Sequence, residues 1–87
     1  MKLIFCKECF DLIRLHKTAR KCVCGKSSGY YKQDGVNAVI FGPCIPVGIL
    51  NSTLLKAITN QPEKGLGKYF TAFILPKKCE KIKHVNI

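Results

Sequence analysis

Four cysteines near the start of the chain constrain its fold more than any other feature. Cys6 and Cys9 are spaced C-x-x-C, and Cys22 and Cys24 are spaced C-x-C with Gly25 directly after them. Two close cysteine pairs joined by a short spacer suit a tetrahedral Zn²⁺, because each pair forms one tight turn and the spacer brings the two turns together. Gly25 supplies the permissive backbone that the tighter turn needs. We therefore predict a structural zinc site whose ligands are these four thiolates.

The length of the chain explains why a metal would help it to fold. We expect the 87 residues to form a single domain, residues 1–87, with a zinc ribbon over residues 1–34. A chain of this size buries only about 60–65% of its unfolded surface, so its apolar core is small. Bound zinc compensates, because the free energy of metal binding becomes folding free energy. A sealed four-thiolate site has no open coordination position, which argues against a catalytic metal.

The cysteine content also bears on the compartment. Six cysteines are compatible with a secreted disulfide framework, but only a few apolar residues precede Cys6, far short of the apolar region of a signal peptide. We therefore expect a reducing cytoplasm, where paired cysteines are more often metal ligands, with iron in the same cage as the alternative to zinc. Cys44 and Cys79 are predicted to be ordinary small buried side chains, and His16 to be exposed.

The chain is strongly basic. Its formal net charge is +10, and the positive charge is concentrated in residues 1–34 and 62–87, around a nearly uncharged middle. Such a charge favours an anionic partner through steering and counterion release, but does not distinguish DNA, RNA, a nucleotide or an acidic protein. The carboxylates form no evident acid/base pair, so we do not expect an enzyme.

Candidate anion-binding residues cluster in the first third of the chain. Basic side chains on one arm of the ribbon and in the loop after the second cysteine pair can contact phosphate, and Ser27 can add a hydroxyl there. One of two adjacent tyrosines can stack a base, because neighbours on a strand face opposite sides. A solvated basic surface and tyrosines packed on the metal site are the alternatives. The candidates are Arg14, Lys17, Arg20, Lys21, Lys26, Ser27 and Lys32 for anion binding, with Tyr30 and Tyr31 for stacking.

The pattern of apolar runs and turn residues predicts a β-rich α+β fold, in which the ribbon continues into a small antiparallel sheet with one short helix. Residues 12–16 indicate a short strand. Tyr30 and Tyr31 begin another, which Asp34-Gly35 turns into a hairpin partner over residues 36–41.

The second half of the chain is punctuated by proline and glycine. Pro46 and Gly48 should keep residues 44–50 irregular or briefly extended. A short helix is predicted near residues 52–59, with N-cap oxygens supplied by residues 51–53. A strand is predicted near residues 69–75, followed by a basic C-terminal tail with an edge strand over residues 85–87.

Residues 35–55 are uncharged and largely apolar. Their prolines, glycines and polar side chains exclude a spanning helix, so we expect no membrane span. We expect a buried strand and helix that pack together. The alternative is an exposed apolar face over residues 39–50 that pairs with another subunit.

Several segments carry a family resemblance. They are Cys22-Val23-Cys24-Gly25, Gly29-Tyr30, Asp34-Gly35, Asn37-Ala38, Pro46-Val47-Gly48 and Asn51, then Gln61-Pro62, Gly65, Gly67, Phe70, Ala72-Phe73 and Ile74-Leu75-Pro76-Lys77. Together they resemble a group of small uncharacterised zinc-ribbon proteins encoded by bacteriophages and bacterial genomes. The resemblance implies a bacterial or phage cytoplasmic setting. In such a setting a compact basic protein regulates transcription or blocks host defence.

Two functional hypotheses follow. The first is a zinc-stabilised, non-enzymatic binding protein that engages nucleic acid or a nucleotide through its basic surface. The second is a protein-interaction module, such as a phage-type host-defence antagonist, which binds a target protein or sequesters a nucleotide signal.

Overall fold

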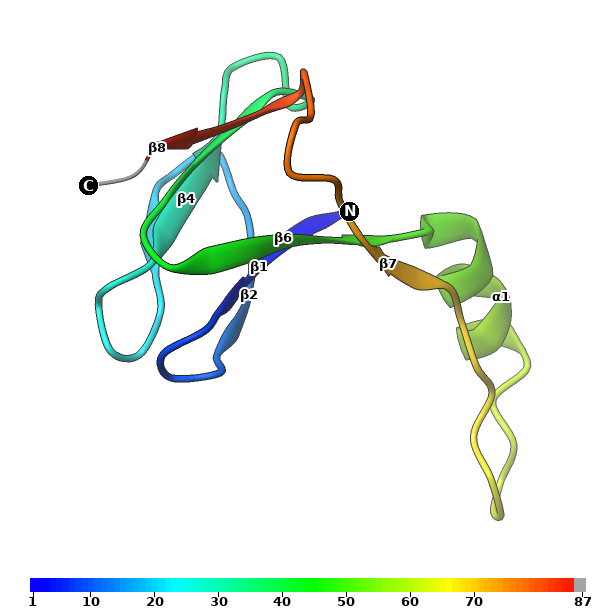
Figure 1. Cartoon of the computed structure of the whole chain (residues 1–87). Coiled ribbons are helices and arrows are strands. Elements are labelled where there is room, and N and C mark those ends of the chain that lie inside the picture. Colours follow the sequence, from blue (N-terminus) through cyan, green and yellow to red (C-terminus); the bar gives the residue numbers. More distant parts are fainter. Residues whose placement is uncertain (86–87) are drawn as a thin grey trace.

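The computed structural model describes residues 1–85, which form two four-stranded sheets and one helix (Figure 1). Sheet A has the strand order β2-β1-β6-β7, and sheet B has the order β3-β4-β5-β8. The predicted β-rich α+β class is confirmed. The elements in chain order are β1 (Lys2–Cys6), β2 (Leu12–Arg14), β3 (Arg20–Lys21), β4 (Ser28–Tyr31), β5 (Ala38–Phe41), β6 (Cys44–Ile49), α1 (Asn51–Thr59), β7 (Ala72–Ile74) and β8 (Ile82–Val85).

The core lies between the inner faces of the two sheets. Side chains alternate between the faces of a strand, so Ile4 and Ile13, which pair across β1 and β2, point to the same side of sheet A. They meet Ala38 and Ile40 from β5 of sheet B in one buried cluster. Leu15 completes it, and its N–H donates to the Lys2 carbonyl. Each sheet therefore has an inner face in the core and an outer face directed away from it.

The predicted hairpin is confirmed as β4 and β5, which pair antiparallel with Tyr30 opposite Val39. Its predicted bounds are wrong, because the two tyrosines end β4 rather than begin it, and β5 starts at Ala38. Asp34 organises the connecting turn, because its carboxylate accepts hydrogen bonds from the N–H groups of Val36 and Asn37, both at 2.9 Å. These bonds lower the pKa of Asp34 to about 2.

The prediction that residues 44–50 are irregular or only briefly extended is wrong. They contain β6, the longest strand, which pairs with both β1 and β7. Met1 and Ile49 exchange backbone hydrogen bonds. The bonded pairs of an antiparallel ladder recur at every second residue, so Pro46 falls opposite Ile4 at an unbonded position. Its missing N–H therefore costs the β1–β6 ladder nothing.

The helix lies where it was predicted, but its start and its packing differ. It begins at Asn51 with Leu50 as the N-cap and no side-chain cap hydrogen bond, so the predicted capping by residues 51–53 is wrong. Thr53 instead donates its hydroxyl to the Leu50 carbonyl and accepts the Thr71 N–H. No residue of α1 is buried, so the expected packing of helix against strand is also wrong. The helix stands at one end of sheet A, beside the segment that leads to β7 (Figure 1).

The last two strands are shorter than predicted or differently placed. β7 covers only Ala72–Ile74 of the expected 69–75, on the edge of sheet A. β8 joins sheet B parallel to β5, with Val39 opposite Lys83, so this sheet is mixed rather than antiparallel. Of the predicted edge strand at 85–87, residue 85 ends β8, and residues 86–87 lie outside the described residues.

Candidate metal centre

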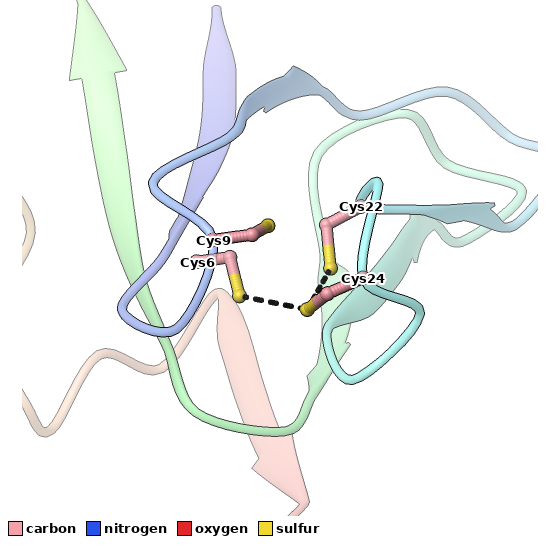
Figure 2. Close-up of side chains that lie close together, drawn as sticks. All are labelled: Cys6, Cys9, Cys22 and Cys24. Atoms are coloured by element: carbon pink, nitrogen blue, oxygen red, sulfur yellow. Dashed lines mark hydrogen bonds between the residues drawn. The ribbon is translucent and has the colours of Figure 1, made fainter.

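The four cysteines come from two turns that face each other (Figure 2). Cys6 ends β1, with Cys9 in the following turn, and the second pair lies between β3 and β4. In each turn the residue after the second cysteine has a left-handed backbone, with φ of 60° at Phe10 and 78° at Gly25. In each, that residue donates its N–H to the carbonyl of the first cysteine, Phe10 to Cys6 at 2.8 Å and Gly25 to Cys22 at 3.0 Å. The two turns therefore have related backbone geometry despite their different spacing.

The sulfur atoms lie close enough to share one ion. All four Sγ atoms are within 4.8 Å of one another. Cys6 and Cys24 are 3.8 Å apart, and Cys22 and Cys24 are 3.4 Å apart (Figure 2). A tetrahedral ion with metal–sulfur bonds of about 2.3 Å requires sulfur separations of about 3.8 Å. All six cysteines of the chain are free thiols. The cluster can therefore hold a metal ion.

Groups around the cluster are arranged to favour thiolates. The Ser27 N–H points to the Cys22 sulfur at 3.3 Å. The Ser27 hydroxyl and the Cys9 N–H lower the pKa of Cys6 to about 6. The Ser27 Oγ is buried and has no partner at ordinary hydrogen-bond geometry among residues 1–85, and its hydroxyl lies where it can favour a thiolate on Cys6 or on Cys44. Such a donor behind the ligands is a common feature of metal–thiolate sites.

The pKa of Cys24 reflects crowding of the thiols. The Lys26 N–H favours the thiolate of Cys24, but the neighbouring Cys22 thiol, burial and the other two thiols together raise its pKa to about 12. The pKa of Cys6 therefore lies far below that of Cys24, because thiols that share a site do not readily ionise together. A cation that replaces these protons relieves the repulsion between the sulfurs.

The structure also tests the predicted burial of the other two cysteines and the predicted exposure of His16. Cys44 is buried, which confirms the prediction, and burial raises its pKa. It lies opposite Cys6 in the ladder, yet its Sγ points to the Phe41 carbonyl at 3.4 Å rather than joining the cluster. Cys79 is only half-buried, so the prediction of a buried side chain is not met there. His16 is exposed, as predicted.

One predicted anion-binding residue is contradicted by the structure. Ser27 is 0% exposed, with its hydroxyl directed into the metal centre, so it cannot contact a phosphate at the surface. The reason is the alternation of the strand that follows. Gly29 and Tyr31 face the core, and Ser27 lies on the same side. The sequence signal for this placement is the even spacing of four residues between Ser27 and Tyr31, which puts both on one face of an extended strand.

The six basic candidates are all exposed, but they do not form one patch. Arg14 lies opposite Leu3 in sheet A, whereas Lys21 lies opposite Ser28 in sheet B. The others are Lys17, Arg20, Lys26 and Lys32, on β3 or in connecting loops. Two nearby carboxylates are engaged with backbone groups, Asp34 in its turn and Asp11 with the Val23 N–H at 3.0 Å.

The two tyrosines separate as strand alternation predicts. Tyr31 faces the core, where its hydroxyl accepts the Lys2 N–H at 2.9 Å and the Lys2 ammonium lies 5.6 Å from its ring centroid. Tyr30 faces outward and stacks on Phe41, with ring centroids 6.3 Å apart and an interplanar angle of 28°. Phe41 was not among the predicted stacking residues, although the predicted hairpin places it on the strand beside Tyr30.

Comparison with protein families, curated proteins and solved structures finds no match to this chain. The fold and the cluster themselves define its class, a small β-rich domain with a four-cysteine site able to hold a metal ion. Within residues 1–85, the helix is too short to cross a lipid bilayer.

Proposed function

We propose that this chain is a small zinc-stabilised, non-enzymatic protein of the cytoplasm that engages nucleic acid or a nucleotide through its basic surface. The observation that carries the proposal is the exposure of all six basic candidates on the elements around the four-cysteine cluster. Exposed Lys and Arg side chains on a chain of net charge +10 attract polyanions and release their counterions.

The choice of zinc rests on the ligand set. Four thiolates in a closed site suit Zn²⁺, and iron in the same cage is the competing assignment. The metal would hold the two turns together and leave the chemistry of the surface to other residues. Six free thiols in one small chain are also what a reducing cytoplasm maintains.

The dependence of binding on salt tests this proposal. A protein that makes six phosphate contacts with a single strand should lose affinity with a slope of about −4 in a plot of log K against log salt concentration. Replacing Lys17, Arg20 and Lys21, which lie on β3 and in the loop before it, together by Ala should reduce the slope by about 2. The matched control replaces Lys56, Lys64 and Lys68, three exposed lysines on and after α1. A salt-independent affinity for oligonucleotides and nucleotides would contradict the proposal.

A second candidate function is favoured by the outer face of sheet A. By register, Phe5, Leu12, Ile45, Val47 and Ile74 point to this face, and Arg14 is the charged residue among its paired strand positions. Phe10 stacks on Phe5 with ring centroids 5.7 Å apart and is 71% exposed. Strands that are apolar on both faces are typical of sheets buried on both sides.

This face includes part of the apolar 39–50 segment and suits a protein partner. The partner would be a second copy of the chain or a target protein, as expected for a phage-type host-defence antagonist. A nucleotide-sequestering oligomer would combine this interface with the basic surface.

A further inference from the structure

The outer face of sheet B has a different chemistry from that of sheet A. Tyr30 pairs with Val39, and Ser28 pairs with Phe41, so these four side chains share one face. The alternate residues Tyr31 and Ile40 pack into the core. The aromatic residues of this outer face therefore do not belong to the buried core between the sheets.

Tyr30 and Phe41 form a continuous aromatic surface. Their rings stack at 6.3 Å between centroids. Val39, on the same face, is only 6% exposed, whereas both rings remain partly exposed. The surface is therefore an apolar platform supported by strands on both sides, which limits the movement of the rings.

Lysines border this platform. Lys21 of β3 pairs with Ser28 of β4, and Lys83 of β8 pairs with Val39 of β5. Both lysines therefore point to the platform's face, from opposite sides of it. Lys32 follows β4, and its N–H donates to the Asn37 carbonyl, which continues the alternation that places Tyr30 outward. All three lysines are exposed. The strand residues of sheet B include no Asp or Glu within the described part of the chain.

We propose that the outer face of sheet B binds single-stranded nucleic acid, with bases stacked on Tyr30 and Phe41 and the backbone phosphates held by Lys21, Lys32 and Lys83. This inference rests on the proposed binding of an anionic partner and specifies its class and its site. Aromatic rings can stack any base whose face is free, and lysines beside them track the phosphates. In a duplex the base faces are stacked on one another, so the same surface offers a duplex only its charges.

Three strand intervals of about 4.8 Å separate β3 from β8, and the register offsets Lys83 from Lys21 by two residues along the strands. The two lysines therefore flank the rings at a span of about 16 Å. A strand of nucleic acid that crosses the sheet can therefore contact a lysine, the aromatic pair and a second lysine in succession. An acidic protein surface would engage the lysines as well, but it would gain little from the rings.

The test compares a fluorescein-labelled oligodeoxythymidylate of about 15 nucleotides with a duplex of the same length, by fluorescence anisotropy of the zinc-loaded protein. The single strand should bind more tightly. Tyr30→Leu and Phe41→Leu should each weaken single-strand binding about 5- to 150-fold and change duplex binding less than about twofold. Tyr69→Leu is the matched control, because Tyr69 is 92% exposed on the segment after α1.

A conservative variant supplies a readout that folding defects do not imitate. The chain has three tyrosines and no tryptophan, so base stacking on Tyr30 should quench its intrinsic fluorescence. Tyr30→Phe should keep the affinity within about twofold and lose most of that quenching. Lys83→Ala should reduce the salt slope by about 0.7, and Lys64→Ala should leave it unchanged.

The outcomes separate this inference from the broader proposal. Two results would overturn the platform but not the proposed anionic partner. One is steeply salt-dependent binding that Tyr30→Leu does not weaken, and the other is fluorescence quenching that persists in Tyr30→Phe. Equal losses for single strand and duplex in Tyr30→Leu would also overturn the platform. A wild-type protein that binds neither oligonucleotide would overturn both.

Discussion

Gly42, at the corner between β5 and β6, connects the core to the metal centre, and replacing it should be costly. Its φ is +88°, in the left-handed region. A Cβ added there would overlap the carbonyl oxygen of Lys26, and would lie 2.9 Å from the Lys26 carbonyl carbon and 3.1 Å from the Ser27 Cα. These atoms belong to the loop that follows Cys24. The corner therefore packs directly against the backbone behind the second cysteine pair.

Two contributions set the size of the effect. A residue with a side chain pays about 1–2 kcal/mol for the left-handed conformation. Overpacking against backbone that cannot rotate away adds about 1–3 kcal/mol. Gly42→Ala should therefore lower the free energy of unfolding by about 2–5 kcal/mol. That is a large part of the total of about 4–13 kcal/mol expected for a domain of this length.

Two further glycines separate these contributions. Gly25 has a φ of +78° but nothing within 4 Å of an added Cβ, so Gly25→Ala should cost only the conformational 1–2 kcal/mol, approximately. Gly67 has open space around it and no left-handed φ, so Gly67→Ala should stay within about 0.5 kcal/mol of wild type.

The assay is urea unfolding at a fixed free zinc concentration, followed by circular dichroism, with zinc affinity measured by competition with a chromogenic chelator. Destabilisation should increase from Gly67→Ala through Gly25→Ala to Gly42→Ala. Gly42→Ala should also weaken zinc binding, because the Lys26 N–H that it displaces favours the Cys24 thiolate. A Gly42→Ala protein no less stable than Gly25→Ala would refute the close contact on which this reasoning depends.

The remaining predictions concern the metal, acid pH and the apolar face of sheet A. Native mass spectrometry should find one zinc ion per chain in the wild type and none in Cys22→Ser. A strong chelator should unfold the wild type, and a fold that stays intact without metal would contradict a structural role. The lowered pKa of Asp34 means that its stabilising contribution is present above pH of about 3.8 and is lost as the pH falls towards 2. Because thiolate-bound zinc is released at a higher pH than this, the contribution of the turn is measured at pH 7 with zinc bound. Asp34→Ala should lower the thermal midpoint there, and an unchanged midpoint would count against the turn geometry. If copies of the chain pair through the outer face of sheet A, Ile74→Glu should shift the mass measured by light scattering from dimer to monomer, and a monomeric wild type would exclude that pairing.

The four-cysteine cluster and the hairpin are the parts of the structure that sequence reasoning predicted best, because both depend on contacts between near neighbours. Cys6 and Cys9 share one turn, as do Cys22 and Cys24, and each turn needs only a few backbone angles to be correct. The β4–β5 hairpin likewise depends on Asp34 binding N–H groups two and three residues ahead. Such interactions are encoded within short segments, so residue types and spacing were sufficient.

The helix and β6 were harder to predict because their environment comes from distant segments. Pro46 fits in β6 because its register with Ile4 directs its nitrogen away from β1, towards Leu75 just beyond the end of β7. Both registers depend on pairing with distant segments of the chain. The exposure of α1 follows from its position at the end of sheet A, which its own apolar residues did not indicate.

The sequence by itself determined which four cysteines come together, the β-rich class and the excess of positive charge, since these follow from composition and local spacing. The tertiary structure decided which side chains share a surface. It placed Ser27 behind the thiolates, divided the basic residues between two sheets, and brought Phe41 and Lys83 beside Tyr30. The physical reason is that strands pair across long separations in sequence, and a shift of one residue in register reverses which face each side chain occupies.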